Sequence, residues 1–247
     1  MTVTKSEGRV ARRKRETLGR IIHAAAELFD AQGFDATTTQ QISERVDIAA
    51  GTLFRYAATK PELLLLVYNE RLREALAAAE RAMDSEAETT EALLAYAVCI
   101  LRAAADQPRN TALFQRELIF ADADEPYRAE GLALVEEMEH RLCDRLMADL
   151  DDQTRAGDAE LSATASARLQ PVALQAARSI FADLHVLLIQ PHRASDALNN
   201  DFADLRLQVA MIVDGLRVRA VEICASTPAG TIDVKTDIPK KNRKEPS

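Results

Sequence analysis

The sequence predicts an all-α protein, and three observations lead to that prediction. The 247 residues include only eight glycines and eight prolines, so long helices meet few interruptions. Ala, Leu, Arg and Glu, all good helix formers, dominate the composition. Apolar residues recur at the 3.6-residue spacing of a helix, and no stretch shows the two-residue alternation of a half-buried strand. We therefore expect helices throughout the chain and no sheet.

The first helix is expected over residues 12–32, where Ile21, Ala25 and Phe29 mark one apolar face. Gly33 follows at the position where a left-handed residue commonly ends a helix.

A capping-box pattern then opens a second, short helix, because Thr38 is followed three residues later by Gln41. Residues 47–49 break that helix, and residues 50–56 form a third. Thr59 is a good N-cap for a fourth helix, since Pro61 falls in its first turn, and this helix extends to about Met83.

Prolines punctuate the remainder of the chain, and proline is tolerated at helix starts but not in helix interiors. On that basis we expect further helices at 90–106, 109–121, 126–150, 159–170, 172–190 and 197–225. Residues 226–247 contain three prolines and the basic run 240–244, and we expect a disordered basic tail there. Contact of that run with DNA is the alternative.

The charge is unevenly distributed along the chain. The whole chain has a formal charge of −8, but residues 1–20 hold seven basic and two acidic residues, giving +5 against −13 for the rest. This asymmetry predicts an anion-binding end on an acidic body. We expect residues 1–11 to be a flexible basic arm that leads into the consecutive Arg12, Arg13, Lys14 and Arg15. These cations would contact phosphates or enter a minor groove, and the alternative is a solvated run that aids solubility.

Residues 37–56 have the pattern of a helix-turn-helix, in which two short helices are joined by a turn of three or four residues. Ile42, Val46, Ile48 and Leu53 would lock the pair from inside. The outward residues would be Thr39, Gln40, Ala50, Gly51, Thr52, Arg55 and Tyr56. Small or polar side chains on such a face suit entry into the major groove. Ordinary packing of two short helices is the alternative.

Three of these positions carry specific chemistry. Gly51 lets the backbone approach DNA bases closely, and Arg55 is able to donate to a guanine edge or to a phosphate. Lys60 lies near a helix N-terminus, where its charge and free backbone N–H groups would hold a phosphate.

Composition and motifs exclude several other classes. The content of 47% hydrophobic and 28% charged residues excludes general disorder, and no apolar run is long enough to cross a bilayer. Cys99, Cys143 and Cys224 are an odd number at wide spacing, and the N-terminus has no apolar signal region, so we expect a cytoplasmic protein without disulfides. We find no catalytic motif and no metal-binding spacing, and expect neither an enzyme nor a cofactor.

The ordered string of motifs resembles the DNA-binding domain of the TetR family of transcriptional regulators. The resemblance covers residues 17–70 and lies in the stretches 33–38, 51–56 and 59–64, which read Gly-Phe-Asp-Ala-Thr-Thr, Gly-Thr-Leu-Phe-Arg-Tyr and Thr-Lys-Pro-Glu-Leu-Leu. It implies a three-helix DNA-binding domain at 12–72 and a larger helical domain at 73–225 for ligand binding and dimerisation.

What the resemblance implies about function is a homodimeric repressor that binds an inverted-repeat operator and is released by a small molecule of unknown identity. Its half-sites would lie about one helical turn, ~34 Å, apart on double-stranded DNA. The last two helices of each subunit would form the dimer interface. The DNA-contacting positions that match are Thr38, Thr39, Ala50, Gly51, Thr52, Arg55, Tyr56 and Lys60, and Gln40 lies beside them.

Three residues depart from the pattern of the family. Phe54 replaces a frequent Tyr and loses a hydroxyl, Asp47 replaces a usual Gly in the turn, and Ala49 replaces the usual capping Ser or Thr. Loss of that cap costs about 0.5–2 kcal/mol unless Asp47 or water substitutes. Ala49 and Phe54 also motivate an alternative function, a regulator-like dimer that acts as a protein-interaction module without specific DNA binding.

Overall fold

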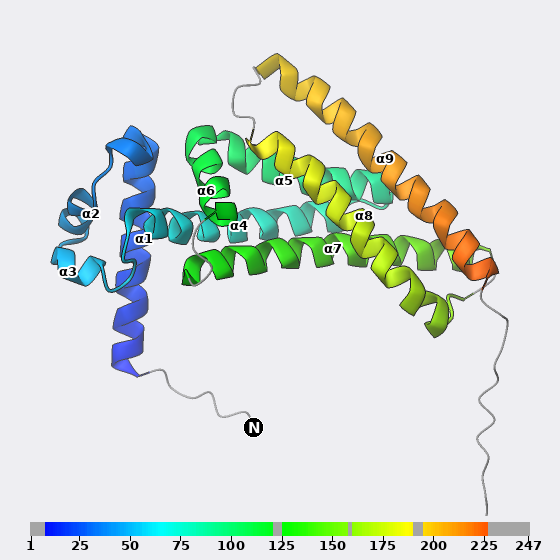
Figure 1. Cartoon of the computed structure of the whole chain (residues 1–247), viewed down its shortest axis with the longest axis horizontal. Coiled ribbons are helices and arrows are strands. Elements are labelled where there is room, and N and C mark those ends of the chain that lie inside the picture. The colour runs from blue at the N-terminus through cyan, green and yellow to red at the C-terminus, as the bar shows by residue number, and fades with distance from the viewer. Residues whose placement is uncertain (1–7, 121–124, 158–159, 190–194, 227–247) are drawn as a thin grey trace, which may run out of the picture.

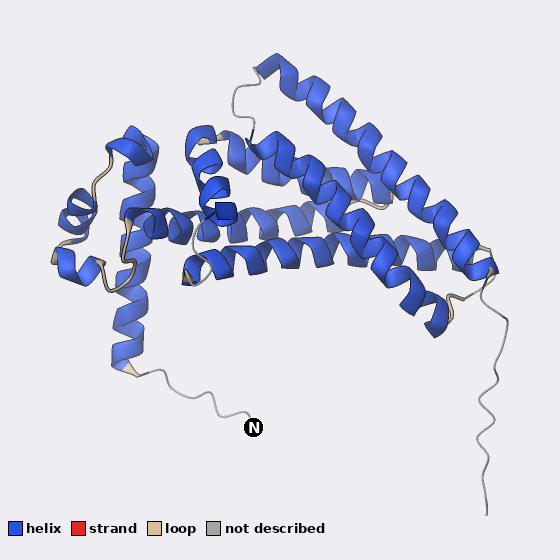
Figure 2. Ribbon diagram, in the orientation of Figure 1, coloured by secondary structure: helices blue, strands red, loops and turns tan. Residues whose placement is uncertain are grey.

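The computed structural model describes residues 8–120, 125–157, 160–189 and 195–226, and these form nine helices without a strand (Figures 1 and 2). The helices are α1 (Arg9–Ala36), α2 (Thr39–Val46), α3 (Ala50–Leu53), α4 (Lys60–Asp84), α5 (Thr89–Ala105), α6 (Pro108–Phe120), α7 (Pro126–Ala156), α8 (Ala163–Ile189) and α9 (Ser195–Ala225). The all-α prediction is confirmed. None of the described helices is both long and apolar enough to cross a membrane.

The helices make two parts, which we call the head (α1–α3) and the body (α4–α9). Figure 1 shows the head at one end of the molecule, with α1 running across the start of α4. In the body α4 and α7 lie along the long axis, and α8 and α9 cross them obliquely.

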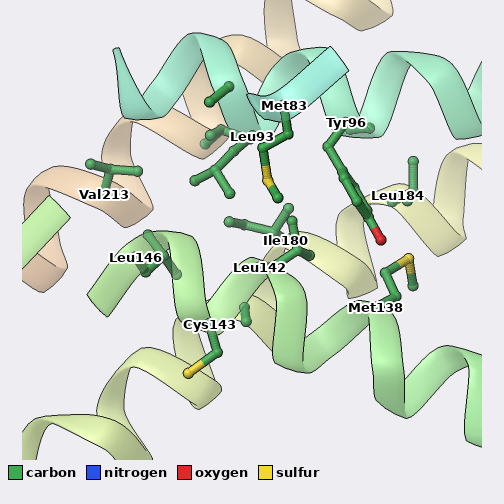
Figure 3. Packing of buried hydrophobic residues seen from close by; sticks show 14 of the residues in the cluster. Met83, Leu93, Tyr96, Met138, Leu142, Cys143, Leu146, Ile180, Leu184 and Val213 are labelled. Carbon is green, nitrogen blue, oxygen red and sulfur yellow. The ribbon is translucent and has the colours of Figure 1, made fainter. Parts of the chain in front are cut away.

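Helix α4 joins the two parts through two apolar clusters. Residues 63–68 of α4 are all buried and pack in the head cluster with Ile21, Phe29, Ile42 and Leu53. Farther along, Leu76, Ala79 and Met83 enter the body cluster. Figure 3 shows Met83 there beside Leu93, Leu142 and Ile180. A single rigid helix therefore contributes to both cores.

The N-terminal helix begins earlier than the sequence pattern predicted. Residues 9–11 already belong to α1, so this part of the expected arm is helical, and the cations at 12–15 lie on the helix as expected. The Arg12 amide donates to the Gly8 carbonyl oxygen at 3.2 Å, and the Arg12 and Glu16 side chains form an i,i+4 ion pair. These contacts add the extra turn. On a helix the four cations point in different directions and do not enter one groove together.

Gly33 interrupts α1, as predicted, although its backbone is not left-handed helical. Its φ of 81° and ψ of 162° lie in a region that only glycine adopts readily. The chain is turned here and α2 can pack back against α1.

Pro171 does not separate two helices, which corrects the expected division at 170–172. It lies inside α8, which runs unbroken from Ala163 to Ile189. Leu169 and Ala173 are fully buried on either side of the proline. Packing of both turns against the body core outweighs the local cost of a proline in a helix interior. The expected C-terminal tail, apart from Ser226, lies outside the described residues.

Candidate nucleic-acid interface and body cavity

The predicted capping box holds the start of α2. The Gln41 amide donates to the Thr38 hydroxyl at 3.2 Å, and the Thr38 amide donates to Oε1 of Gln41 at 2.8 Å. Ile42, Val46 and Leu53 are buried, and Ile48 packs against the same cluster. The inward set of the helix-turn-helix is therefore as predicted, and it fixes α3 against α2.

The turn between α2 and α3 carries the departures from the family pattern. Asp47 adopts the left-handed conformation, with φ of 56° and ψ of 55°, and its amide donates to carbonyl oxygens of Ser43 and Glu44. Ala49 occupies the N-cap of α3 and supplies no side-chain hydrogen bond. Helix α3 ends at Leu53, earlier than the expected 56, and residues 54–56 continue it only as a hydrogen-bonded turn.

The predicted outward residues lie on the surface of this unit. Thr38, Gln40, Ala50, Gly51 and Arg55 are exposed, and Thr39, Thr52 and Tyr56 are half-buried. At Gly51 an added Cβ atom would meet nothing within 4 Å. Packing against the described residues therefore leaves room for a side chain at this position.

A basic groove joins α1 to α3, and reasoning from the sequence missed it. The groove measures about 330 Å³ and is lined by Val10, Arg13, Lys14, Thr17, Thr52, Arg55 and Tyr56. The first four follow i, i+3, i+4, i+7 spacing, so one face of α1 supplies one wall. That spacing could have predicted the groove from the sequence. It was missed because Val10 was assigned to a flexible arm and not to the helix. The groove presents Arg13, Lys14 and Arg55 to a single external anion or phosphate chain.

Lys60, the first residue of α4, bonds to the head, an arrangement that the phosphate-binding role expected from the sequence does not include. Its Nζ donates to the carbonyl oxygens of Phe34, Asp35 and Thr37 at 2.9, 3.3 and 3.0 Å, and it lies 4.3 Å from the centre of the Phe34 ring. An ammonium group has three donors. In this conformation Lys60 therefore caps the end of α1 and keeps no N–H group for a phosphate.

Two further cations of the head have structural partners. Arg20 donates to the Val46 carbonyl oxygen at the end of α2, and Arg45 pairs with Glu27 at 2.6 Å. Both tie α2 to α1. The positive charge that faces outward near α3 is accordingly that of the groove.

The body contains a small apolar cavity between α4, α5, α6 and α8. It measures about 60 Å³ and is lined by Tyr68, Arg71, Leu72, Ala75, Ile100, Ala103, Ala104, Gln107, Thr111, Phe114, Gln115 and Leu188. Phe114 of α6 lines this cavity. Tyr96 and Met138 belong to the body core, and Phe120 is exposed. Figure 3 shows the Tyr96 hydroxyl directed toward Met138 in that core.

Among the described residues, no group of three or more His, Cys, Asp and Glu side chains is placed to hold a metal ion. Burial raises the pKa of the Cys143 thiol, and the charge of Asp144 raises it further. The thiol of Cys143 is therefore protonated at neutral pH.

Comparison with known proteins identifies the family. Residues 21–67 match the family model for bacterial regulatory proteins of the tetR family. The chain is 32% identical over 151 residues to the HTH-type transcriptional regulator TcmR of Streptomyces glaucescens, covering 58% of this chain and 66% of TcmR. It is 29% identical over 110 residues to the repressor KstR of Mycolicibacterium smegmatis, covering 44% of this chain and 54% of KstR. The alignments thus span less than two thirds of these relatives.

Solved structures share the fold. A transcriptional regulator from Rhodococcus sp. Rha1 matches with a TM-score of 0.56 and 17% identity, covering 80% of this chain and 96% of that one. Thermus thermophilus FadR, solved with lauroyl-CoA, matches with a TM-score of 0.53 and 21% identity, covering 79% and 92% of the two chains. With the helix-turn-helix in the head and a helical body behind it, the chain belongs to the tetR family of bacterial regulatory proteins.

Proposed function

We propose that the protein is a ligand-responsive transcriptional repressor that binds an inverted-repeat operator as a dimer and leaves it when a small molecule binds the body. The observation that carries the proposal is the basic groove beside the outward face of α3. Its cations belong to an acidic chain with a formal charge of −8, so the rest of the surface repels phosphate. The match to a family of bacterial regulatory proteins favours DNA binding over the alternative, a protein-interaction module.

In the proposed complex α3 enters the major groove and the start of α1 follows the adjacent phosphates. Arg55 lies where both a guanine edge and a phosphate are within reach, while Arg13 and Lys14 contact the backbone. Gly51 permits close approach of α3. The other proposed contacts are Thr38, Thr39, Gln40, Ala50, Thr52 and Tyr56. The proposed DNA-binding role is consistent with the cytoplasmic location that we expect for this protein.

The proposed dimer interface lies on α8 and α9. Five apolar side chains at helical spacing on α9 are buried inside the subunit: Leu205, Val209, Val213, Leu216 and Ala220. A different set of apolar side chains remains exposed on these helices: Val186, Leu207, Met211, Val218 and Val221. Figure 1 shows α9 on the outside of the body, where a second subunit has access to it. Burial of these side chains between two subunits would stabilise a dimer.

The body cavity is the proposed effector site. It is concave and mostly apolar with a few polar groups, as small-molecule sites are. Thermus thermophilus FadR was solved with lauroyl-CoA, so a protein of this fold accepts a small-molecule ligand.

The DNA-binding proposal is tested with duplexes enriched from random sequence by the purified protein. Enriched duplexes should contain two inverted half-sites, and fluorescence anisotropy should show affinity that falls steeply with salt. Arg55→Ala should weaken binding by tenfold or more. If Arg55 contacts a phosphate, it should also reduce the slope of log K against log salt by about one.

Arg219→Ala is the matched control, because it removes an equal charge from the last part of α9. It should leave the affinity for DNA unchanged. Enrichment of no common sequence, or equal binding by the Arg55 and Arg219 variants, would show that this surface does not read DNA.

A further inference from the structure

The cavity in the body has a chemical signature beyond its apolar character. Among the described side chains that line it, only that of Arg71 carries a charge, and none is acidic. Leu72, Ile100, Phe114 and Leu188 supply apolar surface around it. A site with one cation and apolar walls favours a ligand that has an apolar part and a single anionic group.

Arg71 is oriented by neighbours on two sides. Its guanidinium lies 5.0 Å from the centre of the Tyr68 ring, and Nη1 donates to the Tyr68 hydroxyl at 3.2 Å. Tyr68 in turn stacks on Phe114 of α6, with ring centres 5.5 Å apart. Burial raises the pKa of Tyr68, so its hydroxyl remains protonated at neutral pH. The phenol is therefore able to donate to a carboxylate that approaches Arg71.

The same guanidinium, on α4 of the body, also contacts α1 of the head. Nη2 of Arg71 donates to Oδ2 of Asp30 on α1 at 2.5 Å, and both side chains are about one third exposed. Asp30 precedes Gly33, where α1 is interrupted. About 17 residues, or ~25 Å of helix, separate Asp30 from the basic groove at the other end of α1. One arginine therefore links the cavity to the helix that supplies a wall of the groove.

A second link runs through α6. Asn110 Nδ2 donates to the Phe29 carbonyl oxygen at 3.0 Å, and its Oδ1 accepts from the Phe34 amide at 3.2 Å. Thr111 and Phe114 of the same helix line the cavity. A volume of about 60 Å³ is far below the ~300 Å³ or more of typical ligand sites, so a ligand must displace cavity walls to fit. Movement of α6 would reach α1 through Asn110.

We propose that the cavity takes an apolar small molecule with one carboxylate, and that this carboxylate shares the Arg71 guanidinium with Asp30 and so loosens α1 from α4. The proposal rests on the proposed function in treating the cavity as the effector site. The inference itself adds one specific claim: the ligand carboxylate and the Asp30 carboxylate compete for the Arg71 guanidinium. Removing the resident carboxylate should therefore tighten ligand binding.

The experiment uses paired probes that differ only in charge: octanoate with 1-octanol and 1-naphthoate with 1-naphthamide. Isothermal titration calorimetry on the full chain should show tighter binding of the carboxylate in each pair. Arg71→Gln should weaken carboxylate binding by about tenfold or more and leave the neutral probe unaffected, as expected for loss of a charge-assisted hydrogen bond.

Asp30→Asn is the decisive variant, because it keeps the shape of the side chain and removes its charge. We expect it to bind the carboxylates severalfold more tightly than the parent chain. Glu80→Gln is the matched control. Glu80 pairs with Arg141 at 2.8 Å between α4 and α7 at similar exposure, away from the cavity. It should not alter carboxylate affinity.

The outcomes separate this inference from the proposed function. Equal binding of charged and neutral probes, or unchanged carboxylate affinity in Asp30→Asn, overturns the competition at Arg71 even where DNA binding is intact. Where enriched DNA is bound, linkage requires that a carboxylate that lowers DNA affinity is itself bound more weakly by the DNA complex. If loosening of α1 is the cause, Asp30→Asn should also bind DNA more weakly without ligand. Failure to bind any DNA would refute the proposed function. The calorimetric test of competition at Arg71 would remain valid.

Discussion

The phenol of Tyr127, near the start of α7, donates a hydrogen bond to the backbone carbonyl oxygen of Tyr56 at 2.5 Å. Tyr56 ends the turn that continues α3 and lines the basic groove. Burial raises the pKa of Tyr127, and the nearby carboxylates of Glu130, Glu125 and Glu62 raise it further. Its hydroxyl therefore stays a donor across the physiological range. Through this bond the body directly holds the end of the segment that we propose faces DNA.

Tyr127→Phe should lower the free energy of unfolding by about 1–3 kcal/mol, because the partly buried Tyr56 carbonyl loses its donor. It should also weaken DNA binding by loosening the turn after α3. Chemical denaturation and anisotropy measure the two effects.

Tyr96→Phe is a control with the same atoms removed. The Tyr96 hydroxyl is buried and has no hydrogen-bond partner among the described residues, so its removal should be neutral or stabilising. Equal losses of stability in the two variants would contradict a specific role for the Tyr127 bond.

Local signals in the sequence were enough to predict much of the head. The capping box at Thr38 and Gln41 and the N-cap at Thr59 depend on residues three positions apart, and the structure contains both. Pro171 was misread because the favourable packing of Leu169 and Ala173 comes from distant helices. The internal partners of Lys60 were missed for the same reason. Its carbonyl partners lie 23 to 26 residues away, and nothing next to Lys60 in the sequence indicates them.

The cavity could not be predicted from the sequence either. Its walls come from α4, α5, α6 and α8, and each lining residue fits an ordinary core pattern on its own helix. Only the packing of the four helices brings Arg71 to the apolar wall that contains Phe114. The Arg71–Asp30 pair spans 41 residues, so it had no local signal.

Gly51→Ala should separate DNA binding from stability. An added Cβ meets no atom within 4 Å, and alanine favours helix over glycine by about 1 kcal/mol, so unfolding free energy should stay level or rise. Affinity for enriched DNA should fall, since the methyl group lies where bases approach. Denaturation and anisotropy on the same preparation test both parts. Unaltered DNA affinity would remove the functional reason for this glycine.

Lys14 on α1 and Lys60 at the start of α4 should behave oppositely. Lys60→Met removes the cap on three carbonyl oxygens and should cost about 1–3 kcal/mol of unfolding free energy. Lys14→Met removes an exposed groove cation and should leave stability within about 0.5 kcal/mol while weakening DNA binding in a salt-dependent way. A stable Lys60 variant with weakened DNA binding would restore the phosphate role first expected for Lys60.

Met211→Glu should dissociate the proposed dimer. Met211 on α9 is 66% exposed and belongs to the apolar set that includes Leu207 and Val218. A buried carboxylate at a symmetric interface meets its own copy or apolar surface, and both are unfavourable. Sedimentation velocity should show a shift from dimer to monomer. Phe120→Glu alters a 79% exposed side chain on α6 and should leave the mass unchanged. A dimeric Met211→Glu protein would place the interface elsewhere.

The ion pair between Asp149 and Arg217 should make the free energy of unfolding depend on pH in the acidic range. Arg217 donates from Nε to Oδ2 at 2.9 Å and from Nη2 to Oδ1 at 2.7 Å, which joins α7 to α9, and the Asp149 side chain is only 10% exposed. Burial opposes ionisation of Asp149, but the hydrogen bonds from Arg217 and Thr89 outweigh it and hold the pKa of Asp149 below its usual value.

A lowered pKa in the folded state stabilises the fold above the pKa of the unfolded chain, about 3.9, and this contribution is lost as the pH falls through the lower folded value. Asp149→Asn should therefore be less stable than the parent chain at pH 7, and the difference should shrink below about pH 4. Urea denaturation at equal protein concentration across this range measures it. Glu222→Gln, which breaks an exposed i,i+3 pair with Arg219, should have little effect at any pH. A deficit in Asp149→Asn that stays constant down to the acid limit would show that packing, and not the charge of Asp149, accounts for its contribution.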